Sequence, residues 1–402
     1  MHSQTIRRIL LVPPFCSSQQ CIVAGCRDAL TAQGHVVLLF DAAPANAVLH
    51  AAQTCAASLA RREELQEQAA AFVDTAVIAA AEHMRADVVV TFPHSALSAH
   101  TLSELHVAGI ATVCWMTEDF AAFPYWRAAV SGYDIVATIQ HEPLISELGV
   151  LGHEAVYLPF AANDSCCTPV CTQTAVEGMI VVLGDASEEL AEALRPYIPR
   201  GIVIWGKGWE YYPDFASSYQ GTQESLTRSQ RKALYRDAAI VVNLHSATFD
   251  RGDFVNLETF AIAACGGFQL VDKRTLMEGM FGYDALVQFE TAEELADLLA
   301  EFINDAASRR AYAQRGQQHV LANHTYAVRM ATLMDAVERV HPDSQGASVT
   351  IPEDVAALIV RVAKEYGLPE ESPLEILLDA LEQRDILSGP AVALQVWAMQ
   401  AR

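Results

Sequence analysis

Short apolar segments alternate with longer amphipathic segments along most of the chain. The first 160 residues contain apolar runs at 8–12, 35–40, 87–92, 111–116, 134–139 and 155–160. Several of these runs are continuously apolar, which is the pattern of parallel strands that are covered by helices on both faces. Helical patterns lie between them, at 17–33 and, as one long helix or a helical pair, at 51–85. The pattern predicts a doubly wound α/β domain.

The same alternation returns after a stretch of different composition. Residues 161–178 are small and polar, so we place a domain linker there. Further apolar runs follow at 179–184, 201–206, 239–244, 267–272 and 285–289. In the next helical pattern, Thr291 and Glu294 stand in the N-cap and capping-box positions. Two long helices are predicted at 306–322 and 325–340.

The second series of runs predicts another Rossmann-like domain. We therefore expect domains at 1–162 and 163–340, with a second linker at 341–348. Residues 350–402 are amphipathic and predict a small helical appendage. We interpret the appendage as an oligomerisation or docking module, and as a site of homo-oligomer contact, rather than as part of a catalytic site.

Composition and charge narrow the classes of partner. The chain has 402 residues, a hydrophobic content of 52% and a formal net charge of -23. Such an acidic surface repels phosphate backbones, so we expect no nucleic-acid partner. We see no signal peptide and no apolar segment long enough to span a membrane, which favours a cytoplasmic protein with its nine cysteines reduced. The spacing of the cysteines does not favour a metal site.

Ligands of open α/β sheets bind beyond the carboxyl ends of the strands, so the residues that follow each strand are the candidates. In the first domain, His94, Glu118 and Asp119 follow predicted strands, as do His141 and Glu142. Imidazoles and carboxylates are the groups that can take a proton from an attacking hydroxyl. The alternative is that these residues are simply solvated loop residues.

In the second domain, two segments indicate an anion site. Gly206, Lys207 and the next glycine form a predicted tight turn after a strand, where Lys207 can meet a phosphate. The segment "NLHSATFDRGDFVNLETFAIAACGGFQLVD" leaves a strand and passes His245 and Ser246. It then reaches a helix that starts near residues 253–256, and the N–H groups at such a helix start bind anions. Gly266 and Gly267 end this helix.

The order of these parts resembles a known family. The segment quoted above, "ATVCWMTEDFAAFPYWRAAVSGYDIVATIQ" and "HTYAVRM" are similar to segments of the spore-maturation CgeB-like glycosyltransferases. These belong to the GT-B group, near the retaining family 4 enzymes. The resemblance covers about residues 5–340 and not the appendage.

The resemblance implies a GT-B fold, in which two Rossmann-like doubly wound domains face a cleft. It implies a nucleoside diphosphate sugar as donor, bound mainly by the C-terminal domain, and a protein, glycan or small molecule as acceptor. No bound metal and no other cofactor is expected, because helix N-termini and nearby donors offset the diphosphate charge. His245 and the Asn256 region would contact the donor, and Gly266 and Gly267 would let the backbone approach it.

One departure from the family stands in the same helix. Relatives usually carry an arginine and a glutamate where this chain has Glu258 and Ala261. The donor contacts then either shift to Lys207, Arg251 or Lys273, or donor binding is weakened. A non-catalytic GT-B relative that acts as a nucleotide-binding or sugar-binding scaffold is the alternative function, and another nucleotide-sugar enzyme, such as an epimerase, is a third.

The predicted site combines these observations. The candidate catalytic residues are His94, Glu118, Asp119 and His245. The candidate donor contacts are Gly206, Lys207, His245, Ser246, Asn256, Glu258, Gly266 and Gly267. Together they predict a metal-independent, nucleotide-sugar-dependent glycosyltransferase.

Overall fold

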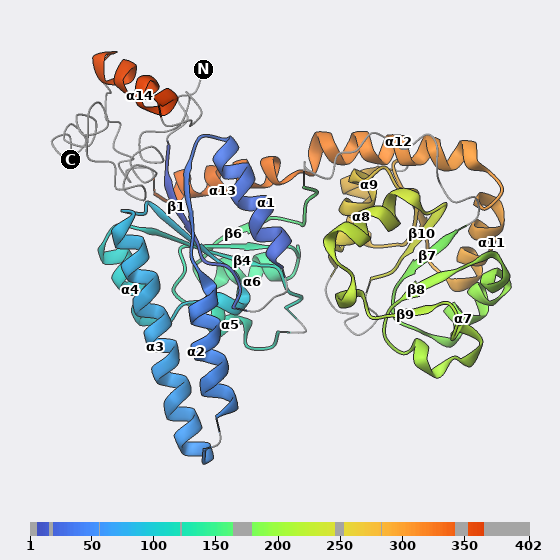
Figure 1. Cartoon of the computed structure of the whole chain (residues 1–402), viewed down its shortest axis with the longest axis horizontal. Coiled ribbons are helices and arrows are strands. Elements are labelled where there is room, and N and C mark those ends of the chain that lie inside the picture. Colours follow the sequence, from blue (N-terminus) through green and yellow to red (C-terminus); the bar gives the residue numbers. More distant parts are fainter. Residues whose placement is uncertain are drawn as a thin grey trace. The chain divides into compact units, whose positions relative to one another are not determined.

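A computed structural model describes most of the chain. The described residues are 6–15, 19–55, 57–120, 123–163, 179–245, 253–282, 284–341 and 353–365. They form two six-stranded sheets with flanking helices (Figure 1). Ser246, Arg251 and most of both predicted linkers lie outside the described residues.

The first sheet contains the six strands predicted from the first half of the sequence. Its strands are β1 (Arg8–Leu11), β2 (Val36–Leu39), β3 (Val88–Thr91), β4 (Ala111–Met116), β5 (Ile135–Thr138) and β6 (Glu154–Tyr157). Their order in the sheet is β2-β1-β3-β4-β5-β6. β1 pairs in parallel with β2 and β3, and β5 pairs in parallel with β6.

The second sheet is parallel throughout. Its strands are β7 (Ile180–Leu183), β8 (Val203–Trp205), β9 (Tyr219–Gly221), β10 (Ile240–Asn243), β11 (Gln269–Asp272) and β12 (Val287–Phe289). The order is β12-β11-β10-β7-β8-β9. The chain adds β8 and β9 on one side of β7, then crosses to the other side and adds β10, β11 and β12 there. β9 was not predicted, because its three residues are half-buried or exposed and form no apolar run.

Helices connect the strands of the first sheet. They are α1 (Gln20–Ala32), α2 (Ala42–Thr54), α3 (Leu59–His83), α4 (Ala99–Val107), α5 (Trp126–Val130) and α6 (Leu144–Val150), with a short 3-10 turn η1 (Pro93–Ser95). The helical pattern at 51–85 is a pair, and its first helix begins earlier than predicted. Asp41 caps α2 by accepting the N–H of Ala43. Pro44 fits the first turn because that turn needs no N–H from it.

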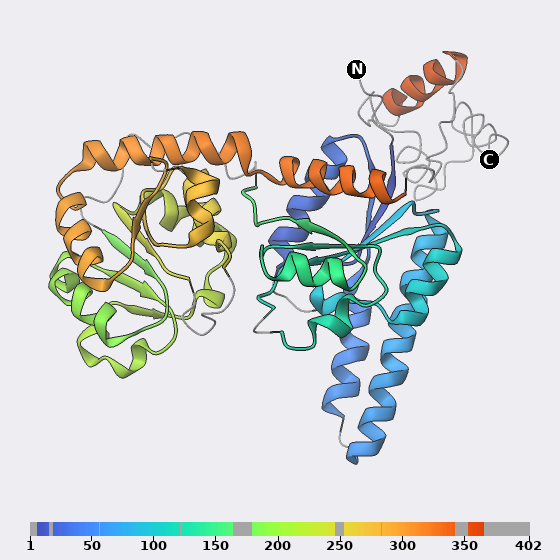
Figure 2. The same cartoon turned by 180° about the vertical axis from the view of Figure 1, so that it is seen from behind.

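The second sheet has its own set of helices. They are α7 (Glu188–Leu194), α8 (Arg228–Asp237), α9 (Leu257–Ala264), α10 (Thr275–Phe281), α11 (Ala292–Phe302) and α12 (Ala306–Asn323), with 3-10 turns η3 (Arg195–Arg200), η4 (Trp209–Tyr211), η5 (Pro213–Phe215) and η6 (Gln223–Ser225). The next helix, α13 (Tyr326–Val340), contacts the first sheet instead, where Glu338 pairs with Arg7 and the ring of Tyr326 meets that of Trp115. α12 packs against α9, as both views show (Figures 1 and 2), and Gln317 donates to the carbonyl of Ala264.

The capping prediction for α11 is confirmed at Thr291 and differs in detail at Glu294. The Thr291 side chain accepts the N–H of Glu294, as an N-cap residue does. The Glu294 carboxylate bonds the N–H of Glu290, one residue before the N-cap, at 2.7 Å.

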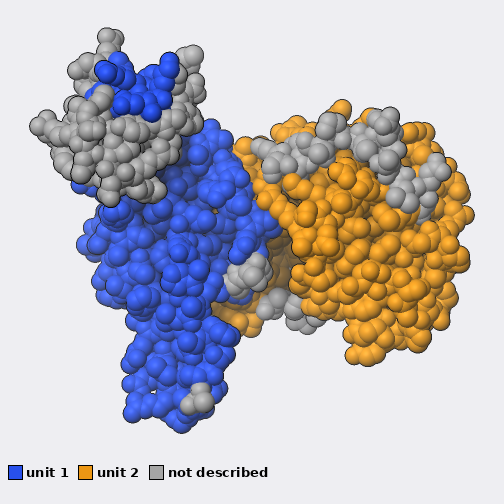
Figure 3. All heavy atoms as spheres, in the orientation of Figure 1, with its two compact units in different colours: residues 1–113, 337–402 blue, residues 114–336 orange. Residues whose placement is uncertain are grey.

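Two compact units divide the chain (Figure 3). One comprises residues 1–113 and 337–402, and the other comprises residues 114–336. The second sheet lies wholly in the second unit. The predicted domain boundaries therefore stay predictions, as does the role of the appendage, of which α14 (Glu353–Glu365) is described. In the described part of the chain, no helix is long and apolar enough to cross a membrane.

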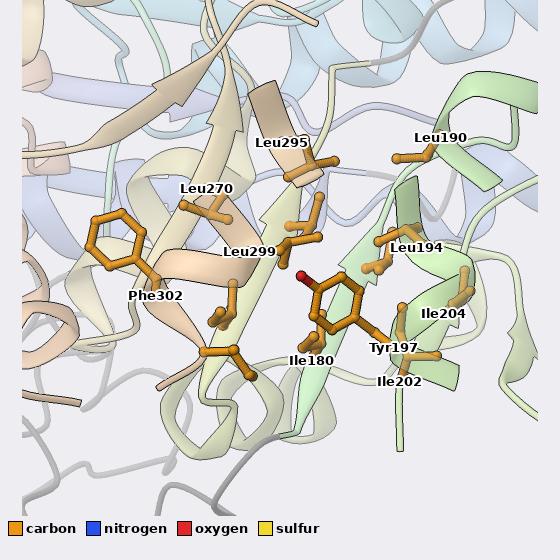
Figure 4. Close-up of a cluster of buried hydrophobic side chains, with 14 of the residues drawn as sticks. Ile180, Leu190, Leu194, Tyr197, Ile202, Ile204, Leu270, Leu295, Leu299 and Phe302 are labelled. Atoms are coloured by element: carbon orange, nitrogen blue, oxygen red, sulfur yellow. The ribbon is translucent and has the colours of Figure 1, made fainter. Parts of the chain in front are cut away.

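Side chains from both faces of the second sheet are buried, as its continuous apolar runs predicted. On one face, Ile180 and Ile204 pack with Leu194 and Leu299 (Figure 4). On the other face, Val181 packs in a separate cluster with residues of α8 and α9. Full burial of each such aliphatic side chain contributes about 1.5–3 kcal/mol. Packing on both faces therefore holds the strands of the second sheet, and with them their carboxyl ends, in place.

The junction between α9 and β11 sets a sharp steric limit. A Cβ atom on Gly267 would lie 2.3 Å from the carbonyl oxygen of Tyr235, which is backbone and cannot rotate away. We expect Gly267→Ala to lower the free energy of unfolding by about 1–3 kcal/mol, because the backbone must shift.

Gly279→Ala is the matched control, since Gly279 is an exposed residue of α10 and a Cβ atom added to it would meet nothing within 4 Å. That substitution should leave stability unchanged or raise it by up to about 1 kcal/mol. Urea denaturation of both variants is the measurement. Equal stabilities would contradict the packing shown here.

Candidate functional site

The strand order of the second sheet reverses between β7 and β10, and this point is where open α/β sheets bind ligands. The carboxyl ends of β7, β8, β10 and β11 meet at the same edge. They are followed by Gly184, Gly206, His245 and Lys273 respectively, directly or one residue later. The candidate donor-binding residues that the structure describes, which exclude Ser246, can therefore be placed relative to this edge.

The turns after β7 and β8 are tied to each other. The N–H of Lys207 donates to Oδ1 of Asp185 at 2.8 Å, and the N–H of Ala186 donates to the carbonyl of Lys207 at 2.8 Å. A Cβ atom on Gly206 would lie 1.8 Å from the carbonyl oxygen of Gly184, so only glycine fits there. Lys207 itself is exposed. The predicted turn therefore presents an ammonium group on a fixed backbone.

His245 is buried and held at both ring nitrogens. Nδ1 lies 2.7 Å from Oδ1 of Asp272, and Nε2 accepts the N–H of Asn256 at 2.9 Å. Because Nε2 must accept this bond, the ring proton of the neutral imidazole lies on Nδ1. The side chain is 1% exposed. In this geometry His245 links the end of β10 to the start of α9 and has no ring nitrogen left for proton transfer.

Asp272, the last residue of β11, is the partner of two groups. Its Oδ1 accepts the backbone N–H of His245 at 2.8 Å as well as the ring bond, and its Oδ2 accepts Nη2 of Arg274 at 2.8 Å. Burial acts to raise the pKa of this carboxyl, but the hydrogen bonds from His245 and the charge of Arg274 outweigh it and lower the pKa. Asp272 is therefore ionised at neutral pH.

Asn256 caps α9 and belongs to a buried amide network. Its Oδ1 accepts the N–H of Thr259 at 2.9 Å, and its Nδ2 donates to Oδ1 of Asn243 at 3.0 Å. Nδ2 of Asn243 in turn lies within bonding distance of Thr259 and of Gln269 on β11. This network fixes the start of α9 against β10 and β11. Asn256 thus acts here as an N-cap, which leaves the first-turn N–H groups of α9 aimed away from the helix.

An arginine on a neighbouring helix offsets the negative charge of Glu258. Its Oε1 lies 3.0 Å from Nη1 of Arg231 on α8, and both side chains are about a quarter exposed. Arg231 also donates to the carbonyl of Gln223. The departure from the family pattern at this position therefore adds no uncompensated charge at the start of α9.

Comparison with known proteins gives the fold. Residues 184–335 match the family described as Glycosyl transferase-like. Sucrose-phosphate synthase from Thermosynechococcus elongatus superposes with a TM-score of 0.57 at 13% identity, over 83% of this chain and 99% of that chain. HepE from Anabaena, in complex with UDP and glucose, gives 0.57 at 11% identity, over 83% and 100%. The chain has the GT-B fold.

A third similar structure agrees with this result. The UDP-forming alpha,alpha-trehalose-phosphate synthase from Burkholderia xenovorans gives a TM-score of 0.56 at 11% identity, over 83% of this chain and 99% of that chain. No curated protein sequence matches the chain. The matched family segment lies in the GT-B half that contains the second sheet, and it runs from the end of β7 into α13.

Gly266 and Gly267 lie at the other end of β11 from this site. Gly266 has a φ of 72° and follows the C-terminus of α9, where a left-handed residue ends the helix. The close approach at Gly267 is to the carbonyl of Tyr235 rather than to a ligand. The prediction that both glycines contact the donor is not supported by this placement, because the carboxyl edge lies beyond Asp272.

The candidate residues of the first sheet follow strands, as predicted. His94 is exposed in η1, and Glu118 is half-buried two residues after the end of β4. Asp119 is buried, and its Oδ1 accepts Nε2 of Gln140 at 3.0 Å. Among the residues that the structure describes, no three His, Cys, Asp or Glu side chains are grouped to hold a metal ion.

Asp272, Arg231 and Arg274 were not predicted from the sequence. Asp272 ends a predicted strand, so its position at the carboxyl edge was available as a signal. Arg231 gave no signal of its own, because its partner Glu258 is distant in sequence and only the fold brings it near. Arg274 is two residues from its partner Asp272 and was missed because a charged residue after a strand is also typical of a solvated loop.

Replacing Asp272 by Asn tests the hub at the end of β11. Asn keeps an acceptor for His245 but turns an amide toward Arg274 in one orientation, so we expect a loss of about 1–3 kcal/mol in unfolding free energy at pH 7. The pKa of Asp272 is lowered in the fold, so its stabilisation is complete above the unfolded pKa of about 4. It is lost as pH falls through the folded pKa.

Denaturant titrations at several pH values between about 3 and 7 measure this difference. The wild type and the variant should converge only at the acidic end. Asp284→Asn is the control, because that side chain is 80% exposed and should change stability by less than about 0.5 kcal/mol. A gap between wild type and Asp272→Asn that stays constant down to the acidic end would contradict the ionised hub.

Proposed function

We propose that this chain is a glycosyltransferase that moves a sugar from a nucleoside diphosphate sugar to a protein, a glycan or a small acceptor, without a bound metal. The match of residues 184–335 to a glycosyl transferase-like family is the observation that carries the proposal. The same residues build the carboxyl edge described above. The structure of HepE with UDP and glucose shows that a protein of this fold binds these ligands.

The charges at the edge support a diphosphate ligand. The first-turn N–H groups of α9 at Leu257 and Glu258 have no partner within the helix and carry partial positive charge. Lys207 adds a full charge from the turn after β8, on a backbone held by Asp185. A diphosphate placed between them is offset by groups that need no reorganisation.

The geometry supports separate roles within the proposed site. His245 holds the start of α9 through its Nε2 and is itself held by Asp272, so we propose that it positions the donor site and does not transfer the proton. Proton transfer at the acceptor would fall to His94, Glu118 or Asp119. In a retaining reaction the leaving phosphate can serve as the base instead, and none of the three is then essential.

The finer assignments belong to the same proposal. Similarity to the CgeB-like glycosyltransferases, a cytoplasmic location and homo-oligomer contact through 350–402 rest on the sequence. The alternative is a non-catalytic relative whose site binds a nucleotide or sugar as a scaffold. Its sequence basis was Glu258 and Ala261, and the pairing of Glu258 with Arg231 removes the charge part of that basis.

A nucleotide panel tests the proposed donor site. UDP, GDP, dTDP, ADP and CDP at about 1 mM are compared by thermal shift, and a ligand with a Kd near 10 μM adds about 2.7 kcal/mol to stability. We expect one nucleotide to shift the transition of the wild type. Lys207→Ala should weaken its binding about tenfold, because a charge beside the phosphates is lost.

Arg200→Ala is the control for Lys207→Ala. Arg200 is an exposed cation just before β8, at the opposite end of the strand from Lys207. Its replacement changes the net charge equally and should not change nucleotide affinity. A wild type that no nucleotide shifts would overturn the proposed function, and hydrolysis of the matching nucleotide sugar separates an enzyme from a scaffold.

The Arg231–Glu258 pair yields a reciprocal prediction. Glu258→Gln leaves Arg231 uncompensated beside α9, so affinity for the nucleoside diphosphate should rise about two- to tenfold, while Arg231→Gln should lower it by a similar factor. Calorimetric titration at low and high salt measures both, and the two effects should shrink together as salt rises. A decrease in both variants would show that the pair acts as a structural unit and not through its charge.

A further inference from the structure

Arg274 follows β11 and begins the turn into α10. Its backbone is extended, with φ at -128° and ψ at 143°, and its side chain gives α10 no cap. The guanidinium instead folds back to Asp272, where Nη2 lies 2.8 Å from Oδ2. Both side chains are about one fifth exposed. The group is thus held at one corner and partly open to solvent.

One nitrogen of this guanidinium lacks an acceptor among the described residues. Nε of Arg274 is buried, and no residue that the structure describes accepts a hydrogen bond from it. A buried N–H of a charged group without an acceptor is destabilising, so such groups usually have one. Two other buried arginines follow that rule. Arg309 donates to the carbonyls of Phe302 and Ile303, and Arg329 donates to that of Phe160.

One other guanidinium nitrogen in the described ranges shares this property. Nε of Arg62 is also buried without an acceptor, but it belongs to helix α3 of the helical hairpin and follows no strand. Arg274 differs because it stands at the carboxyl edge of the second sheet. The location, and not the unpaired nitrogen alone, singles it out.

Continuous hydrogen bonds join Arg274 to the start of α9. Oδ2 of Asp272 holds Arg274, Oδ1 holds His245, and Nε2 of His245 accepts the N–H of Asn256. Four groups in bonding distance therefore lead from the guanidinium to the helix N-terminus. Asp272 fixes the guanidinium by one nitrogen, and the part of the side chain that is open to solvent is left for an oxyanion that presents two oxygens, which an arginine fork binds well.

The neighbouring cation is occupied in a different way. The Lys273 ammonium forms an ion pair with Glu290, and both side chains are more than half exposed. The exposed carboxylate of Glu290 therefore already offsets the charge of Lys273. Arg274 shares the carboxylate of Asp272 with His245, so this carboxylate offsets the charge of Arg274 only in part.

We propose that Arg274 binds an oxyanion of the substrate, with Asp272 as the residue that positions the guanidinium. The inference rests on the proposed function and adds a specific anion contact to that site. Two sources supply such a group, the phosphoryl oxygens of the donor and a carboxylate on the transferred sugar. Both present two oxygens in the spacing of an arginine fork.

The test compares Arg274→Gln and Arg274→Lys with Arg315→Gln as control. Arg315 is a partly exposed arginine of α12 whose Nε donates to the carbonyl of Asp284, before the amino end of β12, so it matches the charge change away from the carboxyl edge. Calorimetry measures binding of the nucleoside diphosphate that shifts the wild type and of the corresponding nucleoside. Circular dichroism and melting temperature confirm that each variant is folded.

Loss of a phosphate contact is expected to be selective. Arg274→Gln should weaken binding of the nucleoside diphosphate at least about tenfold and leave binding of the nucleoside unchanged, and Arg274→Lys should recover part of the loss. If the contact is instead a sugar carboxylate, the diphosphate is unaffected and only a nucleoside diphosphate uronate binds more weakly, relative to its neutral sugar counterpart. Equal affinities of wild type and Arg274→Gln for all of these would overturn the inference while the proposed function stands.

A different pattern separates failure of the proposed function. If the wild type binds no nucleotide, inorganic pyrophosphate and glucuronate serve as probes by thermal shift. Stabilisation of the wild type and of Arg315→Gln, but not of Arg274→Gln, would keep the oxyanion site without a nucleotide donor. Stabilisation that is the same in all three, or absent from all, would overturn it. Asp272→Asn, measured in parallel, should weaken binding of the same ligand through loss of positioning, and less than Arg274→Gln does.

Discussion

The carboxylate of Asp272 ties together the elements from which the candidate site is made. One oxygen receives both the backbone and the ring of His245, and the other receives Arg274. His245 in turn receives the first N–H at α9, and the amide network of Asn243 and Asn256 lies beneath it. The arrangement requires an ionised carboxylate at the end of β11, which the lowered pKa provides. Without it, His245 and Arg274 would lose the partner that they share.

Charge is arranged at this edge in pairs that leave little net field. Arg231 faces Glu258, Arg274 faces Asp272, and Lys273 faces Glu290. A protein with a net charge of -23 can hold a dianionic ligand only where local positive charge exceeds local negative charge. At this edge that excess comes from Lys207, from the amides of α9 and from the part of Arg274 that Asp272 does not occupy. A few local contacts must therefore supply the attraction for an anion that a basic surface supplies in other proteins.

The sequence predicted the fold well because the signal for parallel strands is local. Continuous apolar runs such as 179–184 and 239–244 can be identified without knowing their neighbours, and both became strands buried on two faces. The helix that ends before Gly266 was found for the same reason, since its N-cap Asn256 and its terminating glycine both lie within one short segment of the chain. β9 was missed because an edge strand of three partly exposed residues has no such pattern. The start of α2 was missed because Pro44 suggests a break, although a first turn tolerates it.

The site was only half predictable, because its chemistry depends on partners that are distant in sequence. His245 and Asp272 are 27 residues apart, as are Arg231 and Glu258, and only the strand order brings each pair together. His245 looked like a catalytic base because it is a histidine after a strand. The fold makes it a structural link, since both of its nitrogens have partners. Glu258 looked unfavourable for donor binding, because a comparison of this single position with the family does not include the compensating charge on α8. A residue on a neighbouring helix can thus compensate a charge change at one position of a family. Whether such a site can bind an anion depends on all the charges that surround it in space, which one sequence position does not reveal.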